Sequence, residues 1–357
     1  MKNKIRRARL SNFMLFHQLD LEFSTGINVI SGENSTGKTV IIKFLYSFFK
    51  AFSDSKKKKN LTAEARERIF VEKFQGVFRP DGYKIGRLVN RKHGGNSKTE
   101  NAIVMDDGQI FHCGFGNRQE THMELEFGAK EADVSLQPVY IPPKEIISST
   151  ENFNALYQEY QIAFEETYSD LCSLLDKPLT RGKYTDEQNE IIEDISQILH
   201  GRVSQKNHRF YLSVKGAGTF EMGLVSEGYR KLATIMYLIL SGSLNKGNVI
   251  FWDEPEANMN PKMILPVAKA LHALANMGVQ VFVTTHSYFL QQAFSYLQKK
   301  NGSVPVRYLS FYRKDDGDIA AEQVDALAEL ERNAIMEEFE AVYDREQETF
   351  YEDDGGK

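Results

Sequence analysis

The residues best suited to chemistry in this chain lie at positions 32–39, which read Gly-Glu-Asn-Ser-Thr-Gly-Lys-Thr. The glycines allow the loop to curl so that its backbone amides point inward at a polyphosphate, and the following helix adds the positive end of its dipole. In such a loop Lys38 reaches the β- and γ-phosphates, and the hydroxyl of Thr39 coordinates Mg²⁺. The spacing therefore predicts a P-loop that binds ATP and Mg²⁺ through Gly32, Asn34, Ser35, Thr36, Gly37, Lys38 and Thr39.

A second group of polar residues follows the apolar run at 249–252, after which the chain continues Asp253-Glu254. An apolar strand that ends in two acids delivers carboxylates to the edge of a parallel sheet, where the ligands of open α/β folds bind. We expect Asp253 to hold Mg²⁺, directly or through water, in the manner of P-loop NTPases. Glu254 is the better candidate for the general base, since it can orient and polarise the attacking water.

Two further positions are suited to contact the terminal phosphate. His286 follows the apolar run at 281–283 and lies 33 residues after Asp253, which leaves room for one helix and one return strand to the same sheet edge. Ser226 opens a helical pattern and by itself fits a helix N-cap. The functional alternative is that its hydroxyl and the amides near Gly228 cap the γ-phosphate held by a second molecule.

These four elements together resemble the ATP-binding cassette (ABC) ATPases, in the branch that contains SMC proteins, RecF and the OLD-type ATPases. The resemblance covers residues 1–52 and about 135–312, and Asn12-Phe13 looks like the first-strand motif of this branch. It implies a Walker A loop at 32–39, Walker B acids at 253–254, a signature motif at 226–228, a D-loop at 256–260 and a switch histidine at His286.

The resemblance also implies a head-to-head homodimer, in which two ATP molecules lie between Walker A of one chain and the signature of the other. A P-loop covers one side of the triphosphate, so charge that develops on the far side needs another donor. The chain departs from the family pattern at two points. The signature reads Ser-Glu-Gly rather than Ser-Gly-Gly, and the Q-loop region from Tyr140 to Glu145 lacks a glutamine, with Gln137 slightly early.

The hydrophobic patterns predict the elements that position these residues. Apolar and acidic residues alternate at 19–23, which indicates a half-buried antiparallel strand. A short strand at 27–30 leads into the P-loop, and a buried helix follows at 40–52. Capping boxes at Ser148 with Glu151 and at Thr185 with Gln188 predict two helices, and a hairpin is expected at 202–223. The rest of the chain alternates strand and helix.

The predicted fold class is α/β, a P-loop NTPase of the ABC-ATPase type with a mixed sheet, a β-rich arm and a short helical lid insertion. We expect four parts: an N-terminal ATPase part with the P-loop and the β-rich arm (1–147), the helical lid (148–200), a C-terminal ATPase part with the signature, Walker B and the switch histidine (201–312), and an acidic tail (313–357).

Composition narrows the classes of protein further. The chain has 357 residues and a formal net charge of −5, which excludes a globally basic nucleic-acid coat but leaves local basic patches open. Two cysteines exclude a disulfide framework and a cysteine-rich zinc module. The longest apolar run, 235–240, is far too short for a membrane span. With neither a signal peptide nor a span in the pattern, the cytoplasm is the expected compartment, with no membrane partner.

The sequence contains no nuclease pattern. We therefore expect the ATPase to control the activity of a separate effector protein. The lid at 148–200 is too short for an SMC coiled coil, and too little sequence follows His286 for the TOPRIM domain of OLD-type nucleases. The first hypothesis is a dimeric or higher oligomeric ATP switch in anti-phage defence, with an effector protein from a neighbouring gene. The segment 337–354, with nine acids and one base, then serves for partner docking or is a disordered solubilising tail.

The alternative is a RecF-like repair ATPase that binds DNA, so nucleic acid stays open as a partner. Its basis is a basic run from Lys56 to Lys59, together with Arg66 and Arg68. Such residues can contact phosphates across a dimer, although a run of this size is also typical of a solvated loop.

Overall fold

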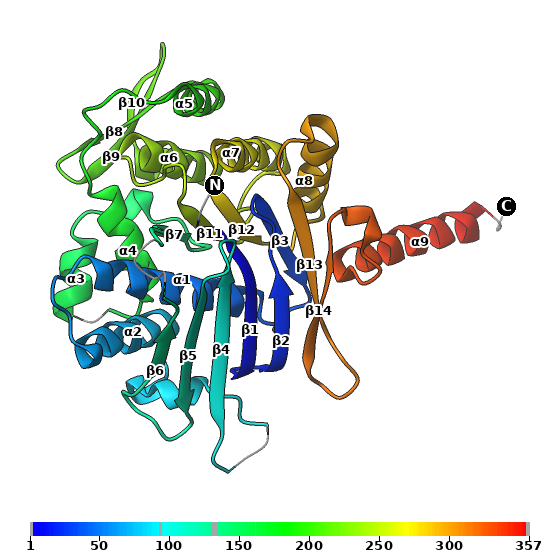
Figure 1. The fold of residues 1–357 in the computed structure, drawn as a ribbon. Helices are drawn as coiled ribbons and strands as arrows, with labels where there is room; N and C mark the ends of the chain where they lie inside the picture. Colours follow the sequence, from blue (N-terminus) through cyan, green and yellow to red (C-terminus); the bar gives the residue numbers. More distant parts are fainter. Residues whose placement is uncertain (1–2, 93–94, 130–133, 161, 355–357) are drawn as a thin grey trace.

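A computed structural model describes residues 3–92, 95–129, 134–160 and 162–354, with side chains up to residue 349. Its centre is a six-stranded sheet in the order β14-β13-β3-β12-β11-β7, parallel except for the antiparallel edge strand β14 (Figure 1). The strands of this sheet are β3 (Ile27–Gly32), β7 (Pro138–Ile141), β11 (Val249–Asp253), β12 (Gln280–Thr284), β13 (Val306–Arg313) and β14 (Ile319–Val324).

The remaining strands form two smaller antiparallel sheets. The five-stranded sheet has the order β2-β1-β4-β5-β6, and the three-stranded sheet has the order β10-β9-β8. Their strands are β1 (Ile5–Phe13), β2 (Phe16–Glu22), β4 (Lys98–Met105), β5 (Ile110–Gly116), β6 (Glu124–Phe127), β8 (Gly201–Lys206), β9 (Arg209–Val214) and β10 (Gly218–Glu221). The predicted strands at 19–23 and 27–30 and the predicted hairpin at 202–223 are therefore confirmed.

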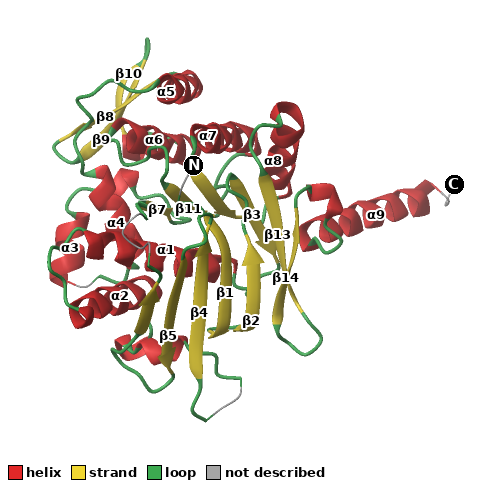
Figure 2. Ribbon diagram, in the orientation of Figure 1, coloured by secondary structure: helices red, strands yellow, loops and turns green. Residues whose placement is uncertain are grey.

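Helices cover both faces of the central sheet (Figure 2). Helix α1 (Lys38–Lys56) lies between this sheet and the five-stranded sheet, in a core rich in phenylalanine that also includes α2 (Ala63–Phe78). A second core on the opposite face contains α4 (Glu166–Leu175), α5 (Asp186–Leu199), α6 (Glu227–Leu240), α7 (Ile264–Met277) and α8 (Tyr288–Asn301). In β11 the residues alternate between the two cores, which explains why this strand reads as a continuous apolar run.

The structure differs from the β-rich arm predicted within residues 1–147 in two respects. The strands are present, but residues 63–78 form helix α2, which begins with the Thr62 hydroxyl accepting a hydrogen bond from the amide of Ala65. Its buried Phe70, Phe74 and Val77 have helical spacing, and the surrounding polar residues hide this pattern in the sequence. The strands also do not stand apart, because β4 pairs with β1 and thereby joins the sheet beside the P-loop helix.

Two local predictions for the lid have different outcomes. The capping box of Thr185 and Gln188 is present at the start of α5. The box of Ser148 and Glu151 is wrong, because α3 (Phe153–Tyr160) begins later and the Ser148 hydroxyl instead donates to Glu145. Short polar side chains bond to whichever neighbour lies within reach, so a cap pattern alone does not locate a helix start.

The segment predicted as an acidic tail from residue 313 begins with a β-strand of the central sheet. Strand β14 pairs with β13 in antiparallel register, so a boundary at 313 falls inside the central sheet. Helix α9 (Ala334–Asp354) follows and projects from the body (Figure 1). This segment is helical, whereas a disordered tail was one of the two alternatives that the sequence allowed. No helix of the described residues is long and apolar enough to cross a membrane.

Candidate nucleotide-binding site

The predicted P-loop connects β3 to α1 and depends on two glycines. Gly32 has a φ of +135°, and a Cβ there would lie 2.1 Å from the carbonyl oxygen of Phe311. Gly37 has a φ of +96°, and its Cβ would lie 2.4 Å from the ring of Phe16. Only glycine fits such positions, because a side chain would clash and because the left-handed backbone is unfavourable for other residues. Asn34 and Ser35 are exposed at the top of the loop.

Lys38 is the first residue of α1 and is almost fully buried, with a relative exposure of 5%. Its Nζ donates to the carbonyl oxygens of Gly32 and Glu33 at 2.9 and 2.6 Å, and Thr36 also donates to Glu33 at 2.8 Å. Burial lowers the pKa of Lys38 to about 8, although Glu254 and Asp253 oppose this shift. The loop therefore holds its cation inside the curve that a polyphosphate would fill.

The predicted magnesium ligands are in contact. The Thr39 hydroxyl donates to Oδ1 of Asp253 at 2.9 Å, although the two residues are 214 positions apart. Asp253 ends β11 and is 2% exposed. A hydroxyl and a carboxylate are oxygen ligands of the kind that Mg²⁺ prefers, and such sites keep several waters and substrate phosphates as further ligands. The donor set therefore fits this ion, and Thr39 and Asp253 are the residues that would hold it.

Two residues that the sequence analysis did not assign also contact Asp253. The Thr284 hydroxyl donates to Oδ1 at 2.5 Å, and the Tyr140 hydroxyl donates to Oδ2 at 3.1 Å. Both lie near the carboxyl ends of strands that flank β11, so strand pairing was the signal that could have found them. Gln137, the weak Q-loop candidate, instead lies before β7 at the opposite edge of the sheet and is exposed.

Glu254 and His286 lie together beside this carboxylate. Their closest side-chain atoms, Oε1 and Nε2, are 3.6 Å apart, and both side chains are about one-third exposed. Glu254 has a φ of +47°, a backbone conformation that costs a residue other than glycine about 1–3 kcal/mol and is common at functional sites. Its amide donates to the carbonyl and hydroxyl oxygens of Thr284, which holds this conformation. Burial and the charge of Lys38 lower the pKa of His286.

Glu256, in the segment predicted as the D-loop, contacts the loop that carries His286. Its Oε1 accepts hydrogen bonds from the Thr285 hydroxyl at 2.7 Å and from the His286 amide at 2.8 Å. The buried Lys231 of α6 donates to the carbonyl oxygens of Pro255 and Ala257. The segment predicted as the D-loop is therefore bonded on one side to the loop of His286 and on the other side to the helix that carries the predicted signature.

The predicted signature lies at the N-terminus of α6. Ser226 occupies the N-cap position and is exposed, but among the described residues its side chain makes no capping hydrogen bond. Gly228 is buried against Met259 and Met263, and a Cβ there would approach Met263 to 3.3 Å. A helix N-terminus with an uncapped hydroxyl is suited to an anion that arrives from outside the chain.

A P-loop after β3, a histidine after the adjacent parallel strand β12 and an acid pair at the end of β11, one strand further, define a P-loop ATPase. Comparison with known proteins agrees with this class. A family described as an AAA domain matches residues 7–202, and an AAA domain described with the AbiEii toxin of a type IV toxin–antitoxin system matches residues 117–290. Because the first match covers more than half of the chain, the protein belongs to the AAA domain family, as an ABC-type ATPase of the SMC/RecF branch.

Curated proteins with similar sequences include DNA repair proteins. The chain is 27% identical over 212 residues to a DNA double-strand break repair Rad50 ATPase of Thermoplasma volcanium, a match that covers 54% of this chain and 23% of the relative. It is 37% identical over 82 residues to the DNA replication and repair protein RecF of Agathobacter rectalis, covering 22% of this chain and 23% of RecF. The chain thus matches about a quarter of the length of each of these two relatives.

Solved structures share the fold. An SMC head bound to the C-terminal winged-helix domain of ScpA aligns with a TM-score of 0.56 at 12% identity, covering 91% of this chain and 98% of that one. An SMC head with an extended coiled coil, bound to the C-terminal domain of ScpA derived from Pyrococcus furiosus, gives 0.55 at 12% identity, covering 97% and 100%. The predicted fold class is therefore confirmed.

Proposed function

We propose that this ATPase is a cytoplasmic switch in which two copies close around two ATP molecules and reopen after hydrolysis. The observation that carries the proposal is the exposed and uncapped N-terminus of α6, which bears Ser226. The P-loop, Asp253 and Glu254 surround one side of a triphosphate, and the far side needs another donor. In this dimer the Ser226 hydroxyl and the neighbouring helix amides of the second copy supply it.

The residues of the site divide the chemistry between them. Lys38 neutralises the β- and γ-phosphates, while Thr39 and Asp253 would hold Mg²⁺, which would offset part of the negative charge of the phosphates. Glu254 accepts the hydrogen bond of the attacking water and orients it toward the γ-phosphorus. His286, 3.6 Å from Glu254, reports whether the γ-phosphate is present, and its contact with Glu256 passes the change to the D-loop.

We further propose that the switch controls a separate effector protein in anti-phage defence. The family match that names a toxin–antitoxin system supports this role, and so does helix α9. From Ala334 to Thr349 this helix carries six acids and one base, with Phe339, Val342 and Tyr343 about half exposed. Like charges oppose the pairing of two α9 helices, so the helix fits a partner with basic and apolar side chains.

Helix α9 contacts the switch region directly. The ring of Phe339 stacks on that of Tyr288, with centroids 4.7 Å apart and an interplanar angle of 9°. Tyr288 is the first residue of α8 and comes two positions after His286. A movement of the switch histidine on nucleotide binding therefore has a short path to the proposed docking helix.

The variant Glu254→Gln tests the switch. It keeps the size of the side chain but removes the base, so we expect ATP binding to persist while turnover falls roughly 100- to 10,000-fold. The ATP-bound dimer then accumulates, which light scattering coupled to gel filtration measures. A monomer in the presence of ATP, or turnover equal to that of the unmodified protein, contradicts the proposal. Loss of phage protection by this variant in a plating assay tests the defence role.

A RecF-like repair ATPase is the second candidate, and the names of the curated relatives favour it. The basic residues named for DNA contact are largely engaged within the chain. Lys56 donates to the carbonyl oxygen of Val134, Lys57 pairs with Asp54 and Arg68 pairs with Glu72, while Lys58 and Lys59 are exposed. Salt-dependent binding to plain duplex DNA that is lost when Lys56 to Lys59 are all changed to alanine supports this candidate. Unchanged binding in that variant removes the role from the run.

A further inference from the structure

Both oxygens of the magnesium carboxylate are held by side chains of neighbouring elements. Oδ1 of Asp253 accepts hydrogen bonds from Thr39 and Thr284, and Oδ2 accepts one from Tyr140. Tyr140 lies near the end of β7 and is 1% exposed. Groups that hold a metal ligand in this way set its orientation, and their loss typically costs about 10- to 100-fold in metal affinity.

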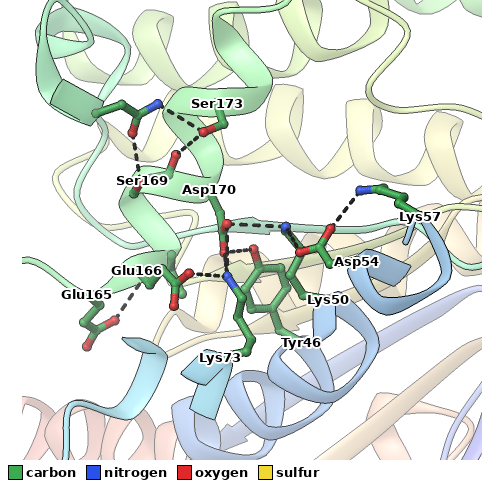
Figure 3. Close-up of polar contacts among 12 residues, drawn as sticks. Tyr46, Lys50, Asp54, Lys57, Lys73, Glu165, Glu166, Ser169, Asp170 and Ser173 are labelled. Atoms are coloured by element: carbon green, nitrogen blue, oxygen red, sulfur yellow. Dashed lines mark hydrogen bonds and ion pairs between the residues drawn. The ribbon is translucent and has the colours of Figure 1, made fainter. Parts of the chain in front are cut away.

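Tyr140 is itself fixed by the helix that follows the P-loop. Its ring packs on the ring of Tyr46 in α1, with centroids 5.1 Å apart. The hydroxyl of Tyr46 donates to Oδ2 of Asp170 at 2.7 Å, and Asp170 belongs to helix α4 of the predicted lid (Figure 3). The position of the lid helix is therefore connected to Asp253 through two buried tyrosines.

A cluster of buried charges clamps α4 onto α1 and α2. Nζ of Lys73 in α2 lies 2.6 Å from Glu166 and 2.9 Å from Asp170, and Nζ of Lys50 in α1 lies 3.5 Å from Asp170 (Figure 3). Lys73 and Asp170 are only 7% and 13% exposed at their side chains. Removing one partner from such a cluster leaves an uncompensated buried charge, so the cluster favours one arrangement of the three helices.

We propose that Tyr140 is a positioning residue for the magnesium carboxylate, and that the lid helix α4 sets its position through Asp170 and Tyr46. The chain thereby uses a tyrosine on β7 near the place where the family pattern has a Q-loop glutamine. This inference rests on the assignment of Asp253 to Mg²⁺ in the proposed function. It makes the lid part of the nucleotide site, because a displacement of α4 changes the support of Tyr140.

The test uses Trp252, which is the only tryptophan of the chain, is fully buried and directly precedes Asp253. Mg²⁺ is titrated into the full chain saturated with a non-hydrolysable ATP analogue, and binding is followed by tryptophan fluorescence and by heat. We expect Tyr140→Phe to raise the half-saturating Mg²⁺ concentration roughly tenfold. Its affinity for the analogue without metal should stay within about twofold, because no phosphate contact is lost.

Two further variants locate the effect. Tyr46→Phe keeps the ring against Tyr140 but loses the bond to Asp170, so we expect a smaller rise of roughly threefold. Tyr237→Phe is the matched control, since the hydroxyl of this buried tyrosine of α6 also donates a hydrogen bond, with the oxygens of Lys177 and Gln205 both 2.9 Å away, in a different part of the core. Its Mg²⁺ requirement should equal that of the unmodified protein, even where its unfolding temperature falls.

The outcomes distinguish the role of Tyr140, the role of the lid helix α4 and the proposed function. Equal Mg²⁺ requirements in Tyr140→Phe and the unmodified protein overturn the role of Tyr140. A Tyr46→Phe variant that matches the Tyr237→Phe control overturns the part assigned to the lid. If the unmodified protein itself shows neither heat nor fluorescence change with nucleotide and Mg²⁺, the proposed function fails instead.

Discussion

The two ends of the predicted ATP site are built very differently. At the P-loop end, Lys38, Thr39 and Asp253 all form hydrogen bonds within the chain, and Lys38 and Asp253 are buried. At the signature end, Ser226 is exposed at the start of α6 and, in the described part of the chain, its side chain caps no amide. The first end is organised by folding alone, whereas the second presents donors to the outside.

In the proposed dimer, this difference assigns a separate role to each end of the site. Buried polar groups that are already paired need no partner chain to hold their geometry. An exposed hydroxyl at a helix N-terminus gains its role only when an anion arrives. We therefore expect nucleotide binding to depend on the P-loop end of one chain, and closure and turnover to depend on both ends.

The largest effect is expected at the P-loop end. Lys38→Ala removes the cation that faces the phosphates, so nucleotide affinity should fall at least roughly 100-fold. Isothermal titration calorimetry measures this loss. Lys43→Ala is the control, because Lys43 lies on the same helix but pairs with Glu165. Near-normal affinity in the Lys38 variant would show that the loop does not hold the phosphates.

Mixing two inactive variants tests whether the two ends belong to different chains. Ser226→Ala should bind ATP normally as a monomer but turn over roughly 100-fold more slowly, because a donor to the transition state is lost. In a mixed dimer with Lys38→Ala, one of the two sites has an intact P-loop and an intact signature. An equal mixture should therefore recover about a quarter of normal turnover, since half of the dimers are mixed and each has one good site. No recovery argues against a shared site.

The smallest effect is a shift in titration at the switch. Burial lowers the pKa of His286 and of His272 below the ordinary value of 6.5, with Lys38 adding to the shift only at His286. A bound γ-phosphate carries negative charge and favours the charged imidazole, so nucleotide should raise the pKa of His286. His272, buried in α7, is the internal control and should not respond. Nuclear magnetic resonance titration of both rings measures this, and equal responses would remove the switch role.

The sign of the pH dependence follows from the same shifts. Because the folded pKa of His272 lies below the unfolded value, the unfolded chain takes up its proton first as the pH falls. This residue therefore lowers the stability of the fold below about pH 6.5 and has no effect well above it.

Much of the nucleotide end could be predicted from the sequence. The loop at 32–39 and the pair Asp253-Glu254 are short local patterns, and each requires its residue types at fixed spacing. The apolar runs at 27–30 and 249–252 are local as well, because strands covered on both faces are apolar at every position. Helix α2 was missed, since its buried face is formed by only a few residues among many polar ones.

The contacts of Asp253 could not be predicted in the same way. Thr284 and Tyr140 are ordinary strand residues in the sequence, and they reach Asp253 only because β12 and β7 flank β11. The same holds for Glu256, whose bond to the His286 amide joins two loops. Strand order decides which side chains meet at a sheet edge, and no local pattern in a single sequence reveals that order.

By itself, the sequence determined the chemical groups of this protein: a glycine-bearing loop with a lysine, two acids at the end of an apolar strand, a histidine after another and a helix start with a serine. Only the tertiary structure decided that Tyr140 donates a hydrogen bond to Asp253, that Lys73 and Asp170 join α2 to α4, and that Ser226 is exposed. The physical reason is the distance along the chain over which each interaction acts. Backbone conformation and hydrophobic period act over a few residues, whereas hydrogen bonds and buried charges join residues that only the packed fold brings within reach.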